Sequence, residues 1–130
     1  MNSFRKLTSQ EVEQLRQQQC SADNWENIEV HSKFDAQYVT SSHFSGKIKL
    51  GYFEKSYTLE GSVSRHSGIK QATLHNCEIG NNVYIGKIGN YIANYAIGDD
   101  TYIENVDMLA VTGKSTFGNG ALVSALNEGG

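Results

Sequence analysis

Histidine is the side chain of this sequence best suited to proton transfer at neutral pH, because its unperturbed pKa lies near 6.5. The chain has 4 histidines. They are His31, His43, His66 and His75. His66 and His75 stand nine positions apart, and no histidine follows His75. These four histidines are therefore the candidates for a general base.

The composition describes one small domain with a slim core. The chain has 130 residues, a net charge of −3, 38% hydrophobic residues, 13 glycines and no proline. No apolar run approaches the ~20 residues that span a bilayer, and the N-terminal MNSFRKLTSQ lacks the apolar stretch of a signal peptide. Cys20 and Cys77 lack CxxC spacing, so neither a disulfide framework nor a zinc site is predicted. We expect a cytoplasmic protein without a membrane partner.

The distribution of charge argues against nucleic-acid binding. Only three basic residues, Lys70, Lys87 and Lys114, lie in the second half, which carries the whole net negative charge. Lys47 and Lys49 are the only close basic pair with a clear spacing. Binding phosphate backbones needs clustered Lys and Arg, so no nucleic-acid partner is predicted.

The first part of the chain predicts a helix and then short strands. Thr8 and Glu11 have capping-box spacing, and the polar run after them predicts a helix to about Gln19. Apolar and polar residues alternate around Ile28 and again in 46–51, which is typical of half-buried strands. The segment 52–64 is compatible with either a strand pair or a loop.

The second half contains a repeat. Residues 74–88 align with residues 92–106 at an offset of 18, and a third copy follows at 117–123 after two extra residues. The identical pairs are Asn76/Asn94, Ile79/Ile97, Gly80/Gly98, Tyr84/Tyr102 and Ile85/Ile103. A finer period of six runs through the first two copies. Repeats nested in this way are typical of a solenoid.

A period of six fits one short strand and one tight corner, with Gly, Asn and Asp accepting left-handed backbone at the corner. Three such units close a triangular coil of 18 residues. Parallel stacking then places Ile79 on Ile97 and Ile85 on Ile103 inside the coils. The two-residue insertion predicts a protrusion at Val106–Lys114. The predicted class is all-β, with an N-terminal α-helix and a short β-rich lead-in before about four coils.

The hexads IGNNVY, IGKIGN and IGDDTY resemble the hexapeptide repeat of left-handed parallel β-helix proteins, a superfamily of trimeric acyltransferases, γ-class carbonic anhydrases and sugar nucleotidyltransferase domains. The match covers about residues 68–126. The chain also looks like the N-terminal portion of a larger uncharacterised bacterial family of this kind. The resemblance implies a left-handed β-helix over 44–130, behind a cap over 1–43. Since repeat character continues to Leu126, we expect the helix to be truncated at its C-terminal end.

The resemblance also implies a homo-oligomer, most simply a trimer, and a site. Acyltransferases of the superfamily use a histidine base between subunits of a trimer, which makes His66 and His75 the candidate catalytic residues. Acetyl-CoA or a nucleotide sugar is the implied ligand, although the acidic late repeats disfavour CoA. A carbonic-anhydrase metal site is not expected, because no histidine lies two coils beyond His75.

Four repeated residues are candidates for binding substrate: Asn76, Asn94, Tyr84 and Tyr102. The two tyrosines should stack on the outer face, where a subunit interface or the N-terminal segment would bury them. Two functions remain open at this point. The first is a transferase-superfamily module acting on an acyl-CoA or sugar substrate, and the second is a non-catalytic structural, ligand-binding or oligomerisation solenoid.

Overall fold

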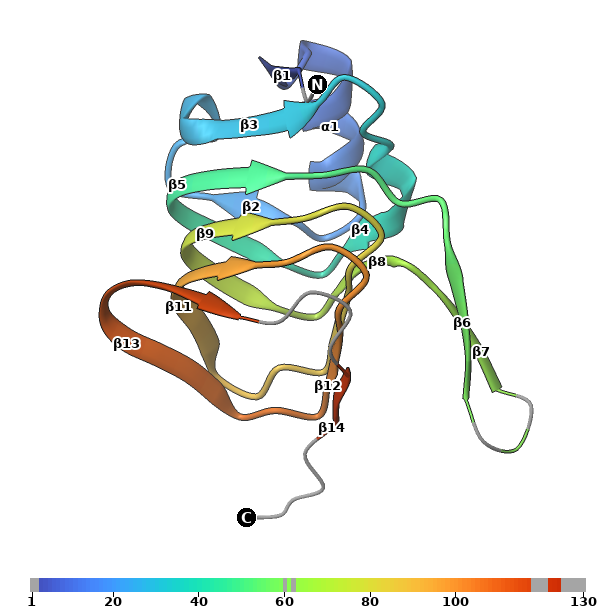
Figure 1. Cartoon of the computed structure of the whole chain (residues 1–130). Helices are drawn as coiled ribbons and strands as arrows, with labels where there is room; N and C mark the ends of the chain where they lie inside the picture. The colour runs from blue at the N-terminus through green and yellow to red at the C-terminus, as the bar shows by residue number, and fades with distance from the viewer. Residues whose placement is uncertain (1–2, 60, 62, 118–121, 125–130) are drawn as a thin grey trace.

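The computed structural model describes residues 3–59, 61, 63–117 and 122–124, and within them the chain is mostly β (Figure 1). From β9 onward the chain alternates between two parallel sheets, and a separate hairpin projects from the stack. The first sheet contains β1 (Phe4–Lys6), β2 (Ser21–Ala22), β3 (Ile28–His31), β5 (His43–Leu50), β9 (Thr73–Ile79), β11 (Tyr91–Ile97) and β13 (Met108–Phe117). The second contains β4 (Val39–Thr40), β8 (Gly68–Lys70), β10 (Tyr84–Gly86), β12 (Tyr102–Glu104) and β14 (Leu122–Ser124).

The register of the strands confirms the alignment made from the sequence. Ile79 lies beside Ile97 in the first sheet, and Ile85 lies beside Ile103 in the second. All four side chains are buried. In the next strand the offset grows to 20, since Ile97 faces Phe117 and Tyr102 faces Leu122. The strand pairing therefore follows both the 18-residue repeat and its two-residue insertion.

The inserted residues distort β13. Ala93 pairs with Ala110 and Tyr95 with Ser115, so residue 94 of β11 faces residues 111–114 of β13. The ribbon of β13 makes a wide curve at this edge of the stack (Figure 1). The predicted irregularity thus takes the form of a shift in strand register.

Left-handed backbone positions mark where the strands bend or end. Between Thr73 and Val106 they recur with the predicted offset, as Asn76/Asn94, Asn82/Asp100 and Lys87/Asn105, all with φ between 52° and 65°. Four of the six are Asn, whose short polar side chain tolerates this conformation. Each repeat thus bends at the same three places.

The N-terminal segment covers one end of the stack. Helix α1 (Ser9–Gln17) begins with the predicted capping box, in which the Glu11 amide donates to Thr8 and the Glu11 carboxylate accepts from the Thr8 amide. Its Leu15 is 1% exposed and belongs to the main apolar core. Two 3-10 turns, η1 (Trp25–Asn27) and η2 (Ala36–Tyr38), follow it. The lone Trp25 packs against the core, as predicted.

The predicted cap over 1–43 and the predicted β-helix over 44–130 both contribute strands to each of the two sheets. In the first sheet β3 pairs with β5, and in the second β4 pairs with β8. The lead-in therefore supplies strands to the same sheets as the repeats, besides its helix.

The segment 52–64, which its sequence leaves compatible with either a strand pair or a loop, contains the first strand of an antiparallel hairpin and the start of the second. Strand β6 (Ser56–Leu59) pairs with β7 (Val63–His66), and the pair stands away from the stack (Figure 1). An isolated two-stranded hairpin is marginal in water. Its base is accordingly held to the stack by side-chain contacts described below.

Candidate functional site

A cleft of about 350 Å³ lies on the outer face of the first sheet, across β1, β3, β5 and β9. Its lining residues are Lys6, Asn27, Glu29, Lys47, Ile48, Lys49 and Glu78. The strand period explains this lining. Within β5, Ile48 and Leu50 are 1% exposed and point to the core, so Lys47 and Lys49 are directed outward.

The charged residues form a row across four strands. Lys6 pairs with Glu29, Glu29 with Lys49, and Lys49 with Glu78. None of these neighbouring opposite charges lies within 4.0 Å of its partner, so the row is not locked by ion pairs among the described residues. With Lys47 added, the cleft carries three ammonium groups and two carboxylates, and its net charge is positive.

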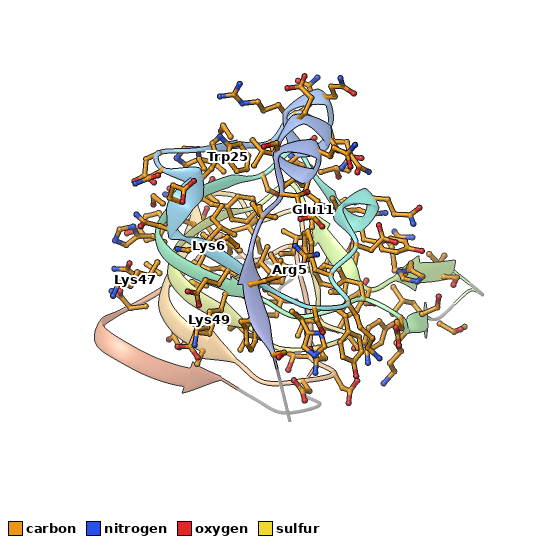
Figure 2. All side chains as sticks on the ribbon, turned by 90° about the horizontal axis from the view of Figure 1, so that it is seen from above. Arg5, Lys6, Glu11, Trp25, Lys47 and Lys49 are labelled. Carbon is orange, nitrogen blue, oxygen red and sulfur yellow. The ribbon has the colours of Figure 1, made fainter. Side chains whose placement is uncertain are left out.

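The lysines differ in their partners. Lys6 Nζ donates to the carbonyl oxygen of Glu26 at 2.6 Å, which holds that ammonium group at the rim. Neither Lys47 nor Lys49 has an ion pair within 4.0 Å among the described residues. Figure 2 shows Lys6, Lys47 and Lys49 on one side of the β1 ribbon. The ammonium groups of Lys47 and Lys49 therefore have no carboxylate partner in the described part of the chain.

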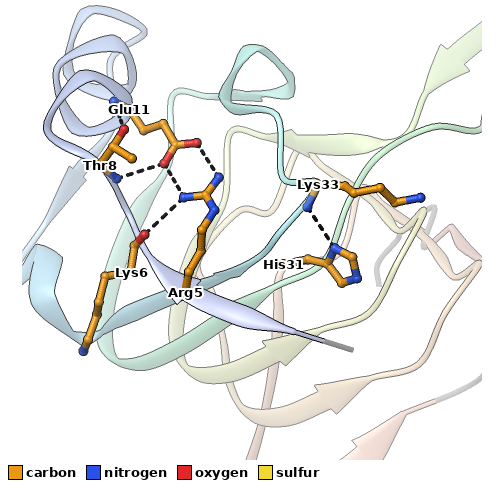
Figure 3. A network of polar contacts seen from close by, with 6 residues as sticks. All are labelled: Arg5, Lys6, Thr8, Glu11, His31 and Lys33. Carbon is orange, nitrogen blue, oxygen red and sulfur yellow. Dashed lines mark hydrogen bonds and ion pairs between the residues drawn. The ribbon is translucent and has the colours of Figure 1, made fainter. Parts of the chain in front are cut away.

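Arg5 points to the other side of β1 and takes no part in the cleft. Its guanidinium donates to both Glu11 carboxylate oxygens, at 2.8 and 2.9 Å (Figure 3). These hydrogen bonds lower the pKa of the Glu11 carboxyl. The contact ties β1 to the start of α1, and so fixes the strand that carries Lys6.

A second hollow of about 260 Å³ adjoins the first and shares Lys49 and Glu78 with it. The other residues lining it are Phe4, Ile79, Gly80, Ala96, Ile97 and Gly98. Phe4 is 38% exposed, and the Lys49 ammonium lies 5.3 Å from the centroid of its ring. This half of the cleft is therefore apolar and bordered by small residues.

Tyr84 and Tyr102 lie on the second sheet, remote from the cleft residues in the strand order. They stack as predicted, with ring centroids 4.7 Å apart, and each is 2% exposed. The hairpin, rather than the N-terminal segment, covers them, since Tyr57 of β6 contacts Tyr102 edge to face at 5.3 Å. Both rings are enclosed by the protein itself.

A polar network closes this covered face. The Tyr102 hydroxyl donates to Glu104 at 2.8 Å, and Arg65 of β7 lies 3.8 Å from the other oxygen of that carboxylate. The Tyr57 hydroxyl donates to the Asn82 carbonyl at 2.6 Å. Burial, together with the neighbouring Glu104, raises the pKa of the Tyr102 phenol.

Residues 4–130 match the family model described as Domain of unknown function (DUF4954). The chain belongs to this family. A protein of Treponema pallidum (strain Nichols), described as "Uncharacterized protein", is 28% identical over 126 residues, which cover 97% of this chain. The DUF4954 chain spans 17% of the length of that relative. No solved structure matches it.

The assignment to DUF4954 corrects the resemblance drawn from the hexads. The prediction that the chain is a member of the hexapeptide-repeat superfamily is wrong, because the family that matches almost the whole chain is DUF4954. Short strands select aliphatic residues, and tight bends select Gly, Asn and Asp. A period of six in these residue types therefore indicates short strands joined by tight bends, and it does not identify one family. The resemblance therefore no longer supports acetyl-CoA or a nucleotide sugar as the ligand.

His75 of the DUF4954 chain is exposed on β9, with both ring nitrogens in hydrogen bonds. Nδ1 lies 2.8 Å from Ser45 Oγ, and Nε2 lies 3.1 Å from Asn76 Nδ2. The Asn76 amide is oriented by its oxygen, which accepts from the Lys47 backbone N–H at 3.0 Å. Its Nδ2 therefore donates to Nε2, which leaves the proton on Nδ1 to donate to Ser45. The basic nitrogen is already engaged.

His66 lies on β7, away from His75 on β9. Its ring stacks on Tyr38 at 3.9 Å with an interplanar angle of 10°, and Nδ1 lies 2.8 Å from the Ser67 carbonyl oxygen. The structure does not bring the two histidines together within one chain. His66 instead joins the base of the hairpin to η2.

Asn76 and Asn94 occupy left-handed bends, with φ of 52° and 65°. Asn76 Nδ2 lies 3.5 Å from Asn94 Oδ1, which forms a short ladder between neighbouring strands. Gly46 occupies the matching bend of β5 with φ of 68°, and a Cβ there would meet the Asn76 amide oxygen. The two amides stabilise bends, and neither lines the cleft.

Two absences hold for the described residues. They contain no group of three or more His, Cys, Asp and Glu side chains placed to hold a metal ion. In that same part of the chain no helix has the length and apolar character needed to cross a bilayer.

Proposed function

We propose that this DUF4954 segment is a non-catalytic ligand-binding module, and that its cleft over β1, β3, β5 and β9 binds a small anion. One observation carries the proposal. Lys47 and Lys49 line the cleft and have no ion pair among the described residues, while Lys6 is held at its rim. An ammonium group on a flexible stem is a common ligand for phosphate and carboxylate groups.

The states of the two candidate bases favour binding over catalysis. Nε2 of His75 accepts from Asn76, and His66 is stacked on Tyr38, half-buried at the base of the hairpin. A general base must lie within hydrogen-bond reach of the proton that it removes. Neither histidine lines the cleft. The hypothesis of a transferase therefore has less support than the hypothesis of a ligand-binding module.

For the fold, the proposal is a left-handed parallel β-helix of about four triangular coils. It is supported by parallel pairing in both sheets and by the three left-handed bends that recur in each repeat. An experimental structure tests it, and an open sandwich or right-handed crossovers would contradict it.

Assembly into a trimer also remains a proposal. The tyrosine pair that suggested a subunit interface is covered by the hairpin of the same chain, so the trimer needs another surface. Sedimentation equilibrium at high protein concentration measures it, and a stable monomer would contradict it.

Anion binding is tested by titrating the protein with inorganic phosphate at low salt and following backbone amide shifts. We expect saturable changes at Lys6, Lys47 and Lys49, and Lys47→Glu should weaken binding about tenfold or more. The matched control is Lys70→Glu, because Lys70 is exposed on the second sheet. Unsaturable shifts, or equal losses in both variants, would contradict an anion site in this cleft.

A further inference from the structure

The two hollows on the first sheet form one elongated cleft with unlike ends. They share Lys49 and Glu78, which therefore lie at the junction of the two hollows, and a ligand that occupies both hollows passes these two side chains. One end has lysines at its rim, and the other has an exposed aromatic ring beside small residues. The ligand that suits both ends joins an anionic group to a flat ring.

We infer that the cleft binds a nucleoside phosphate, with its phosphate at Lys6 and Lys47 and its base against Phe4. The inference rests on the proposed anion-binding function and names its ligand class. It adds a requirement that anion binding alone does not have, namely a ring at the Phe4 end.

The phosphate end is defined by its donors. Each ammonium group offers three N–H donors, and one of those on Lys6 is used by the Glu26 carbonyl. Lys47 is exposed, while its own backbone N–H is fixed by Asn76. The backbone on which Lys47 stands is thus held in place while its side chain stays free to reach a phosphate.

The base end is defined by Phe4 and the small residues beside it. The edge-to-face contact of Phe4 with buried His31, at 6.0 Å, orients the aromatic ring. Ala96 of β11 lines this hollow with a methyl group only, and Gly80 and Gly98 border it just after β9 and β11. The space beside the Gly80 Cα is taken by Asp99, so the flat group is placed against Phe4 and Ala96. Stacking of a base on an aromatic side chain contributes about tenfold or more to affinity.

Lys49 connects the two ends. Its ammonium group lies over the Phe4 ring, which is the surface that the base would cover. Binding therefore moves the Lys49 ammonium from the ring to the phosphate, replacing a cation–π contact with a charge-assisted hydrogen bond.

The two carboxylates select a mononucleotide over a longer polyanion. Glu29 and Glu78 flank Lys49 in the charged row, at the middle of the cleft. A carboxylate accepts hydrogen bonds from ribose hydroxyls. The same carboxylates repel additional phosphates, so a nucleic-acid strand suits this cleft less well than one nucleotide does.

Calorimetric titration with ADP, UDP, uridine and inorganic phosphate tests the inference. We expect at least one of the two nucleotides to bind about tenfold or more tightly than phosphate, and uridine to bind more weakly than UDP. Phe4→Ala should remove the advantage of the nucleotide and leave phosphate binding unchanged. Phe4→Leu, which keeps an apolar side chain without a flat ring, should do the same and guards against a folding defect.

Lys47→Gln should weaken binding of both nucleotide and phosphate about tenfold, and the matched control Lys70→Gln should change neither. If phosphate binds as tightly as both nucleotides, or Phe4→Leu binds nucleotide normally, the nucleotide inference is wrong while the anion site stands. If no anion binds saturably, both proposals fail.

Discussion

The outer faces of the two sheets differ although their strands belong to the same repeats. On the first sheet the outward row Lys6, Glu29, Lys49 and Glu78 is open and lines a cleft. On the second sheet the outward Tyr84 and Tyr102 are as buried as core residues, because the hairpin β6–β7 covers them. Burial of an outer face thus depends on which other segment reaches it.

The largest expected effect comes from opening the covered face. Tyr102→Ala removes the ring that stacks on Tyr84 and contacts Tyr57, and it deprives Glu104 of its hydroxyl donor. We expect a loss of about 3–5 kcal/mol in the free energy of unfolding, as for other large aromatic truncations. Urea denaturation measures it. A loss below about 1 kcal/mol would mean that the hairpin does not seal this face.

Removing only the hydroxyl separates packing from polar contacts. Tyr102→Phe keeps the ring and leaves Glu104, which is 7% exposed, without the hydrogen bond from Tyr102. We expect a loss of about 1–3 kcal/mol. Tyr57→Phe is the matched variant, because Tyr57 is half-buried and its hydroxyl also donates one hydrogen bond. It should lower the free energy of unfolding by about 1 kcal/mol. Equal values for the two would contradict a special role for the Glu104 contact.

The covered face should also make stability depend on alkaline pH. The pKa of Tyr102 is raised by burial and by Glu104, so the folded state keeps its proton where the unfolded chain has lost it. The protonated Tyr102 phenol contributes fully to the free energy of unfolding below the ordinary tyrosine pKa of about 10. This contribution is lost as pH rises above that value, by up to about 1.4 kcal/mol per pH unit. Urea denaturation between pH 8 and roughly 11 should show a steeper decline for the natural chain than for Tyr102→Phe. Parallel curves would contradict this assignment.

The smallest effect is expected on the open face. Lys49→Gln removes an exposed charge whose neighbours Glu29 and Glu78 lie beyond ion-pair distance. We expect the free energy of unfolding to change by less than about 0.5 kcal/mol, while phosphate affinity falls. A stability loss as large as that of Tyr102→Phe would mean that the charged row is structural, and that the two faces are alike.

Much of the scaffold could be predicted because its determinants are local or periodic. The capping box at Thr8 and Glu11 fixes the start of α1 through contacts three residues apart. The repeat at 18 fixes which isoleucines align, since a shift of register would expose them. Repeated hexads do not identify a family, however, and the superfamily inferred from them was wrong.

The cleft was harder to predict because its parts come from separate strands. The alternation in 46–51 directs Lys47 and Lys49 outward, and they stand out as a pair in the sequence. Nothing in the sequence indicates that β1 runs antiparallel beside β3 and brings Lys6 and Phe4 to them. The residues predicted for the site, His66, His75, Asn76, Asn94, Tyr84 and Tyr102, lie outside it.

The capped helix, the strand period, the stacked isoleucines and the bends at Asn all follow from the order of residues along the chain. Each of these depends on backbone preference or on a regular apolar pattern, and both can be recognised along the chain. Which outward residues are buried and which remain open depends instead on the packing of distant segments. That outcome depends on where the hairpin and β1 dock, and docking is set by contacts between segments far apart in sequence.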